Sequence, residues 1–263
     1  MSAKEGKVFY YRDELTDDFA KTVQTPRPLP ENYRYISNNP LERLFGFIAY
    51  RLLLKPFAWL YLKLKFHHTF VKSAGVKALK GGHLIYGNHT ALFADVFQPS
   101  LIKMSRKNYI VAGEQANSLT GILWITRSIG AIPLTKSVKQ NREMLRCIKK
   151  RLQEGASVTI FPEAHVWPYY TRIRPYSSAS FKYAAIFHAP VICMTTCYQK
   201  RKFSKTPKMI TYLDGPFYPD PALSTQENAE RLHAAVMETM QKRAEEHSTY
   251  SVYEYIKLEE EET

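Results

Sequence analysis

Short apolar runs alternate with amphipathic segments of helical length through most of the chain after residue 82. The short runs are rich in β-branched and aromatic residues, whereas the longer segments repeat apolar residues every three or four positions. This order predicts an α/β sandwich in which a sheet is flanked by helices. The expected strands are 83–87, 109–112, 131–134, 158–161, 191–198 and 209–213, and the expected helices are 96–104, 119–129, 138–154, 179–188 and 226–246.

The segment from Leu41 to Phe66 is densely apolar and aromatic, but basic residues interrupt it. No uncharged run approaches the roughly 18–20 residues that a bilayer span needs. We therefore expect this segment to lie on a membrane rather than cross it, as a helical hairpin divided at Pro56. A buried hairpin with lysines at its rim is the alternative. The interrupting residues are Arg43, Arg51, Lys55, Lys63 and Lys65, and Tyr50, Trp59 and Tyr61 suit the interface.

No Pro/Gly/Ser-rich linker and no internal repeat divides the 263 residues, of which 45% are hydrophobic. A chain of this size can bury one sizeable core. We expect a main domain over residues 71–250, an N-terminal arm and hairpin over 1–70, and an acidic tail over 251–263. The tail's Glu259–Glu262 run has the composition of a disordered segment.

The cysteines and the start of the chain bear on its environment. Cys147, Cys193 and Cys197 form an odd set without metal-ligand spacing, which indicates buried thiols in a reducing compartment. The charged start is not followed by an apolar run, so a secretory signal is not expected.

The charge balance favours an anionic partner. The formal net charge is +13, and because Glu259–Glu262 contribute −4, the rest of the chain carries +17. Such an excess is typical of proteins that bind nucleic acid or an anionic membrane surface. The apolar segment favours the membrane. Because the chain also lacks zinc-ligand spacing and a recognisable RNA-binding motif, we expect no nucleic-acid partner.

Two segments carry candidate chemistry, and each follows an expected strand. Asn88-His89 comes directly after one strand, with Asp95 six positions beyond the histidine, and Phe161-Pro162-Glu163 ends another. Ligands of open α/β sheets collect at these carboxyl ends. A histidine oriented by a carboxylate can act as a general base, although a helix-capping aspartate beside an unrelated histidine gives the same pattern.

Four short blocks occur in a fixed order at residues 88–95, 130–136, 161–164 and 189–192. Together they resemble the glycerolipid (lysophospholipid) acyltransferase family, the bacterial 1-acylglycerol-3-phosphate acyltransferases in particular. The resemblance extends over residues 83–198, and its specificity comes from the order and separation of the blocks. It implies an acyltransferase-like sheet flanked by helices, with an N-terminal membrane-associated helical hairpin.

The sequence departs from the family pattern at three places. Five residues separate His89 from Asp95 where the family has four, Lys136 stands where the family has arginine, and Ala164 replaces a glycine. On one continuous helix, residues six apart differ by roughly 240°, so the histidine and aspartate must straddle a turn. Lysine keeps the charge of arginine but lacks its bidentate fork.

The resemblance assigns roles to these residues. His89 would be the general base and Asp95 its orienting carboxylate, while Glu163 would position the acceptor hydroxyl or a cation. An ion pair of Glu163 with one of two nearby arginines is the alternative. Those arginines lie in an aromatic cluster that can bind phosphate or form a packed loop. The substrate-binding candidates are Lys136, Phe161, Pro162, Glu163, Arg172 and Arg174, and no metal ligands are expected.

The implied reaction moves a fatty acyl group from a thioester or acyl-phosphate to a hydroxyl of lysophosphatidate or a related lysolipid. No bound cofactor is expected, because acyl-CoA, acyl-ACP or acyl-phosphate would be a co-substrate, and acyl carrier protein would be a partner in the second case. The expected location is the cytoplasmic face of the cell membrane, with peripheral or monotopic attachment. The alternative is a catalytically inactive peripheral lipid-binding protein of the same fold. No Gly-x-Ser-x-Gly elbow supports a serine hydrolase.

Overall fold

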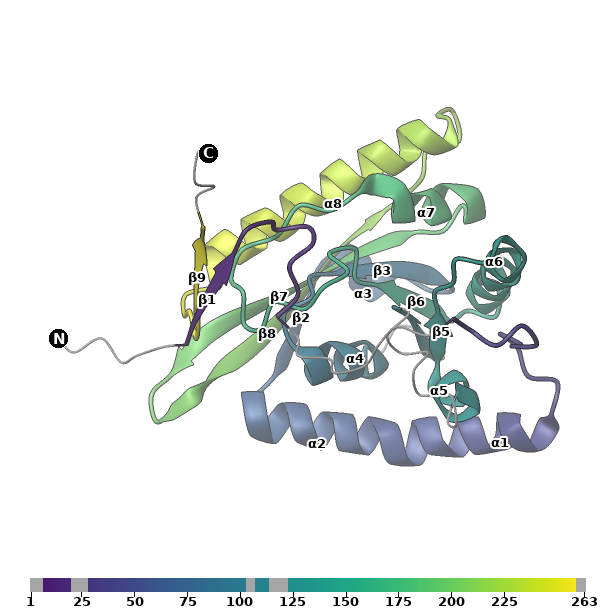
Figure 1. Ribbon diagram of the computed structural model, residues 1–263, viewed down its shortest axis with the longest axis horizontal. Helices are drawn as coiled ribbons and strands as arrows, with labels where there is room; N and C mark the ends of the chain where they lie inside the picture. Colours follow the sequence, from purple (N-terminus) through teal and green to yellow (C-terminus); the bar gives the residue numbers. More distant parts are fainter. Residues whose placement is uncertain (1–6, 20–27, 103–106, 114–122, 259–263) are drawn as a thin grey trace.

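A computed structural model describes residues 7–19, 28–102, 107–113 and 123–258. Its centre is a seven-stranded sheet in the order β2-β8-β7-β3-β6-β4-β5 (Figure 1). Only β7 and β8 pair antiparallel, and the other neighbours in this sheet are parallel. The strands are β2 Thr69–Lys72, β3 His83–Gly87, β4 Asn108–Ala112, β5 Ala131–Pro133, β6 Ser157–Ile160, β7 Val191–Arg201 and β8 Ser204–Phe217.

Helices cover both faces of this sheet, which confirms the predicted α/β class (Figure 1). The amphipathic stripe of α6 and the helices α7 and α8 pack on one face. On the other face, α3 and the end of α4 meet the sheet. The helical elements are α1 Pro40–Ile48, η1 Ala49–Leu54, α2 Lys55–Phe66, α3 Ala74–Ala78, α4 Leu92–Leu101, α5 Leu123–Ile129, α6 Val138–Gln153, η4 Ser178–Phe181, α7 Lys182–Phe187 and α8 Thr225–His247.

The central strand β3 is buried on both faces, as its apolar run Leu84-Ile85-Tyr86 predicts. Because side chains alternate along a strand, Leu84 and Tyr86 enter the core beneath α6 and α8, whereas Ile85 joins the opposite core. Tyr86 stacks on Phe181 with ring centroids 3.9 Å apart. The strand that leads to His89 is therefore held on both sides by packed side chains.

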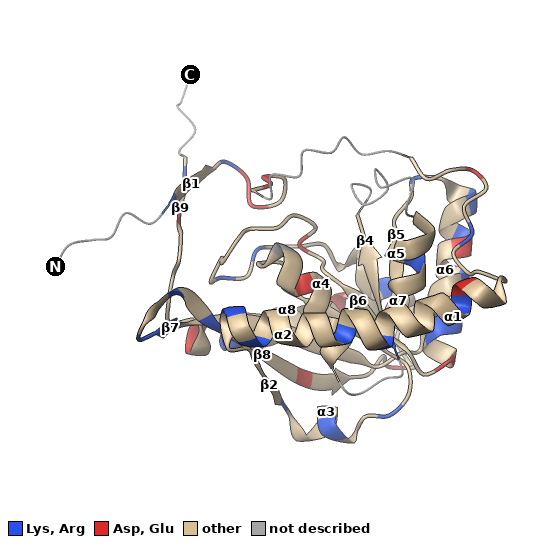
Figure 2. Cartoon of the chain, turned by 90° about the horizontal axis from the view of Figure 1, so that it is seen from below, with Lys and Arg blue, Asp and Glu red and all other residues tan. Residues whose placement is uncertain are grey.

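The predicted helical hairpin over residues 41–66 is wrong. Residues 40–66 form one continuous helix of 27 residues, about 40 Å long at 1.5 Å per residue (Figures 1 and 2). Pro56 lacks an N–H and would break a regular helix, but the π-helical η1 directly before it already changes the hydrogen-bond ladder, and Lys55 N–H bonds to Tyr50 O. The proline is therefore accommodated at the first turn of α2.

This helix packs on the domain along one stripe and leaves the rest exposed. Gly46, Ala49, Tyr50, Ala58, Leu62 and Phe66 are buried, whereas the helix's other residues are exposed or half-buried. By length and composition the helix could also cross a membrane. Its buried stripe, however, ties it lengthwise to α4 and α5 (Figure 1).

The two ends of the described chain meet, which the predicted division into arm, domain and tail did not include. Strand β1 (Val8–Tyr11) pairs in parallel with β9 (Glu254–Lys257). Trp167 is fully buried between them and Phe19, and stacks on Tyr255 at 5.1 Å. The residues 251–258 are therefore part of the folded body, and the predicted boundary at residue 70 falls inside β2. Residues 259–263 of the acidic tail lie outside the described residues.

Other element boundaries differ from the prediction in ways that matter for the site. Helix α4 begins at Leu92 rather than Val96, which places Asp95 in its first turn. Strands β7 and β8 extend to a long hairpin, and Phe203 at its tip is 91% exposed. The predicted segments 103–104 and 119–122 lie outside the described residues. All three cysteines are buried and free, as predicted.

Candidate active site

Asn88 fixes the turn that follows β3. Its side-chain Oδ1 accepts from Thr196 N–H at 2.8 Å, and its Nδ2 donates to Thr196 O at 3.1 Å. The side chain thus continues the β3–β7 ladder by one rung after the backbone has left the sheet. Gly87 before it has no space for a Cβ, which would lie 2.7 Å from Met194 Cε and 2.9 Å from Phe161 Cε1. Together these contacts set where His89 emerges.

The His89 ring lies against Phe161 and binds the carboxylate of Asp95. Nδ1 of His89 is 2.8 Å from Oδ2 of Asp95, and the ring stacks on Phe161 with centroids 4.6 Å apart and planes 20° apart. The histidine side chain is 17% exposed and the aspartate 1%. No described residue hydrogen-bonds to Nε2, so this nitrogen can accept a proton from a molecule at the surface.

The carboxylate of Asp95 is oriented by the start of α4. Its Oδ2 also accepts from Ala91 N–H at 2.8 Å, while Asp95 N–H bonds to Ala91 O. Negative charge is stabilised in the first turn of a helix by the helix dipole. The chain between His89 and Asp95 turns through the helix start, and this turn accommodates the fifth intervening residue. The spacing that departs from the family pattern is therefore compatible with a hydrogen-bonded pair.

The side chain of Glu163 is buried beneath the His89 loop and accepts a hydrogen bond from its backbone. Its Oε2 accepts from His89 N–H at 3.0 Å and pairs with Arg174 Nη2 at 3.2 Å, and both charged side chains are 0% exposed. Its Oε1 accepts from Arg174 N–H. Burial raises the pKa of Glu163, and the Arg174 guanidinium opposes that effect. Of the two roles considered for Glu163 from the sequence, the structure shows the ion pair with an arginine, and that arginine is Arg174.

Within the described part of the chain, the side chain of Arg174 is buried and its hydrogen-bond partners are all protein groups. Its guanidinium donates to Glu14 O at 3.0 Å and to His165 O, and it lies 4.9 Å from the Trp167 ring centroid. A guanidinium that is buried and bonded on several sides cannot reach a phosphate at the surface. We therefore assign Arg174 a structural role in place of the predicted substrate contact.

The other substrate-binding candidates are dispersed. Arg172 is exposed, lies 5.4 Å from the Tyr170 ring centroid and lines a cavity of about 200 Å³ beside β9. Lys136 is exposed after β5, and β6 and β4 separate β5 from β3 in the sheet order. Pro162 is half-buried between Phe161 and Glu163. Ala164 has a left-handed backbone with φ of 61°, so this turn does need the conformation that glycine adopts easily.

Sequence reasoning missed the residue that joins the His89 loop to the long helix. Tyr198 of β7 is buried, and its hydroxyl lies 2.9 Å from Thr90 Oγ1 and 3.2 Å from Thr90 O. Tyr198 shares an apolar cluster with Ala94 beside Asp95 and with Leu62 of α2. Because 108 residues separate Thr90 from Tyr198, no local pattern could indicate this contact. Within the described residues no group of three His, Cys, Asp or Glu could hold a metal ion.

Comparison with known proteins agrees with this architecture. A family profile described as Acyltransferase matches residues 64–197, just over half of the chain. The chain therefore belongs to the acyltransferase family, as the four sequence blocks predicted. Among solved structures it is similar to the 1-acyl-sn-glycerophosphate (LPA) acyltransferase PlsC from Thermotoga maritima, with 17% sequence identity and a TM-score of 0.50. That match covers 79% of this chain and 95% of PlsC, and at this identity it shows a shared fold. Comparison with curated protein sequences gives no match.

Proposed function

We propose that the protein transfers a fatty acyl group from a thioester or acyl-phosphate donor to a hydroxyl of lysophosphatidate or a related lysolipid. The observation that carries the proposal is the 2.8 Å contact between His89 Nδ1 and Asp95 Oδ2 in a chain of the acyltransferase family. The fold likeness to PlsC, an LPA acyltransferase, supports lysophosphatidate as the first acceptor to test.

In this mechanism Asp95 accepts a hydrogen bond from His89 Nδ1–H, which holds the proton on Nδ1 and leaves the lone pair of Nε2 available. Nε2 removes the proton from the acceptor hydroxyl while the oxygen attacks the acyl carbonyl. The tetrahedral adduct collapses as the C–S or C–O bond to the donor breaks, and the imidazolium returns the proton to the leaving group. The buried carboxylate stabilises the imidazolium meanwhile. No acyl-enzyme is required.

We further propose that the helix over residues 40–66 lies on the cytoplasmic face of the cell membrane. Its outward side carries large exposed apolar residues together with spaced cations (Figure 2). An apolar face with a basic margin is the pattern of an interfacial helix on anionic lipid. The exposed apolar residues are Leu41, Leu44, Phe45, Phe47, Ile48, Leu52, Leu53, Phe57, Trp59, Leu60 and Leu64.

The β7–β8 hairpin supports the same placement. Its Arg201 donates to Lys65 O at 2.9 Å, so the hairpin tip lies beside the end of α2. Phe203 at the tip is exposed between Lys202 and Lys205. Because α2 also packs on α4, which carries Asp95, docking by this face would bring the His89 loop close to the lipids that supply the acceptor.

The test is transfer of radiolabelled palmitate from acyl-CoA to lysophosphatidate by the purified full chain, repeated with acyl-ACP and acyl-phosphate as donors. Acyl-ACP use would identify acyl carrier protein as a partner. His89→Ala should abolish transfer. His188→Asn is the matched control, since it changes an exposed histidine whose left-handed backbone asparagine also tolerates. No transfer by the unaltered protein from any donor, with intact vesicle binding, would favour the inactive lipid-binding alternative.

A further inference from the structure

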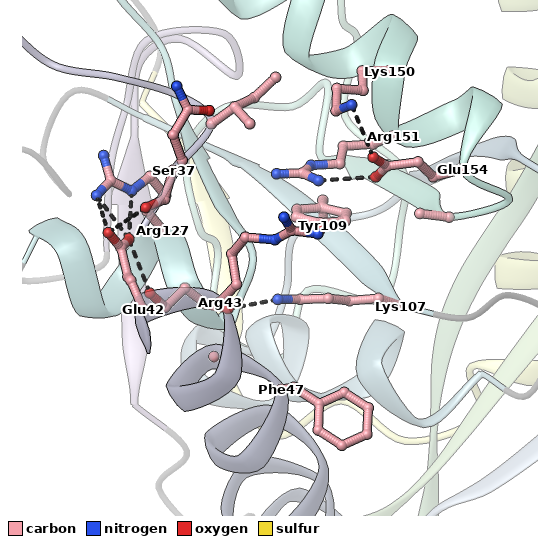
Figure 3. A pocket seen from close by; sticks show the side chains of 15 residues that line it. Ser37, Glu42, Arg43, Phe47, Lys107, Tyr109, Arg127, Lys150, Arg151 and Glu154 are labelled. Atoms are coloured by element: carbon pink, nitrogen blue, oxygen red, sulfur yellow. Dashed lines mark hydrogen bonds and ion pairs between the residues drawn. The ribbon is translucent and has the colours of Figure 1, made fainter. Parts of the chain in front are cut away.

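A cavity of about 520 Å³ lies among α1, α5 and α6 at the start of β4 and β6, and Figure 3 shows the side chains that line it. It opens where β4 and β6 begin, because Lys107 precedes β4 and Ala156 precedes β6. His89 follows the carboxyl end of β3, which runs parallel to β6. The cavity at the amino ends of the strands and the candidate active site at their carboxyl ends therefore lie at opposite ends of the sheet. Helices α1, α5 and α6 form its walls.

Basic side chains dominate the cavity lining. Five of the lining residues are cationic and two are acidic. Both carboxylates are already paired: Glu42 binds Arg127 at 2.7 Å, and Glu154 binds Arg151 at 2.9 Å and Lys150 at 3.4 Å. The described lining therefore carries three more positive than negative charges. The cations are Arg43, Lys107, Arg127, Lys150 and Arg151.

Three of these cations extend toward Tyr109 from different elements (Figure 3). Arg43 comes from α1, and its side chain has no hydrogen-bond or ion-pair partner among the described residues. Arg151 comes from α6, lies 4.7 Å from the Tyr109 ring centroid, and has a buried Nε without a partner in the described chain. Lys107 Nζ lies 5.0 Å from the same centroid. Like charges that converge repel one another unless an anion lies between them.

The environment of Lys107 shows the cost of this arrangement. Burial, together with the nearby charge of Arg151, lowers the pKa of Lys107 to about 8. The tyrosines on either side, Tyr50 and Tyr109, do not offset this at neutral pH, because burial raises the pKa of each to about 12. A bound anion would favour the charged lysine.

We propose that this cavity binds a phosphate group. Two guanidinium groups and an ammonium group present forked and point-charge donors to phosphate oxygens, and the three surplus positive charges are enough to neutralise a phosphate dianion. Phe47 of α1 lines the cavity and is also exposed on the apolar side of the long helix. The phosphate can therefore come from a lipid headgroup beside that helix or from a soluble phosphate compound.

The first arm of the test uses inorganic phosphate and the full chain in zwitterionic detergent, with binding measured by calorimetry. Arg43→Gln should weaken binding at least about tenfold, since it removes a charge-assisted hydrogen bond. The guanidinium of Arg43 has no partner among the described residues, so the variant should fold. Arg51→Gln makes the same change on the same helix outside the cavity lining and should leave the affinity unchanged. Lys150→Gln and its neighbour Lys149→Gln form a second matched pair.

The second arm separates the two sources by sedimentation with phosphatidylcholine vesicles containing either phosphatidate or phosphatidylserine. A preference for phosphatidate that Arg43→Gln removes and Arg51→Gln keeps identifies a lipid headgroup. Phosphate binding without that preference identifies a soluble ligand. His89→Ala should change neither result, which keeps this site separate from the proposed catalysis. Equal phosphate affinity in the Arg43→Gln, Lys150→Gln and unaltered proteins would overturn the proposal.

Discussion

Replacement of Glu163 by glutamine tests whether this residue holds the His89 loop or contacts the acceptor. The carboxylate accepts from His89 N–H, from Arg174 N–H and from the Arg174 guanidinium, and neither charged side chain is exposed. Glutamine has nearly the same shape but no charge. Its amide group would direct hydrogens at groups that are themselves donors, so the variant leaves the Arg174 charge buried without compensation.

The expected loss of stability is large. Breaking a buried ion pair by removing one partner costs about 3–5 kcal/mol of unfolding free energy. A protein of 263 residues shifts in Tm by roughly 2–4 °C for each kcal/mol, so Glu163→Gln should lower the Tm by roughly 6–20 °C. The discrimination is sharp, because a surface carboxylate that only contacted substrate would change the Tm very little.

The assay combines thermal unfolding with acyl-transfer kinetics below the Tm of the variant. The double variant Glu163→Gln/Arg174→Met removes both charges and should recover roughly 1–3 kcal/mol relative to the sum of the single changes. Because Glu163 holds the backbone N–H of His89, kcat should fall while KM stays close to that of the unaltered protein. A Tm within 2 °C of the unaltered protein (about 1 kcal/mol or less), together with a raised KM, would refute the reasoning and restore the predicted acceptor contact.

Three further predictions follow from exposed and buried groups. Burial lowers the pKa of His68 from 6.5 to about 4, so as the pH falls the unfolded chain binds a proton at this histidine before the folded protein does. The free energy of unfolding should therefore fall by roughly 3 kcal/mol between pH 6.5 and 4. In urea titrations His68→Gln should reduce this dependence of stability on pH, and an unchanged dependence would contradict the prediction. Leu52→Ser/Leu64→Ser should weaken vesicle binding at least about tenfold, since each leucine contributes roughly 1.5–3 kcal/mol when buried, whereas Val138→Ser, equally exposed on α6, should not. Sulfate keeps its charge at neutral and alkaline pH, so its affinity for the basic cavity should fall as pH rises from 7 to 9 and Lys107 loses its proton; a flat titration would exclude Lys107 as a ligand.

The sequence contained the information for the central strands and for the His89 turn because both are encoded locally. The apolar run at residues 84–86 is typical of a strand that is buried on both faces, and the turn residues follow that strand directly. The separation of His89 and Asp95 was enough to exclude a single helix. It could not show that α4 would begin at Leu92 and bring the carboxylate back.

Contacts between distant segments could not be predicted in this way. The ion pair of Glu163 with Arg174 had two sequence candidates for the arginine, and the choice depends on β1 and β9, whose neighbouring Glu14 and Trp167 surround Arg174. The long helix was predicted as a hairpin because proline is read as a break, and the π-helical turn before Pro56 has no sequence signature. The cations of the basic cavity come from segments spread between residues 43 and 151 of the sequence. Within each segment alone, their pattern is that of an ordinary solvent-exposed helix face or loop.

The account depends most on His89 acting as a base that Asp95 orients. The direct measurement is the acyl-transfer rate of Asp95→Asn beside that of His89→Ala, with vesicle binding and Tm recorded for both. We predict a loss of about 10²–10⁴ for Asp95→Asn, complete loss for His89→Ala, and unchanged vesicle binding. Full transfer by either folded variant would contradict the account.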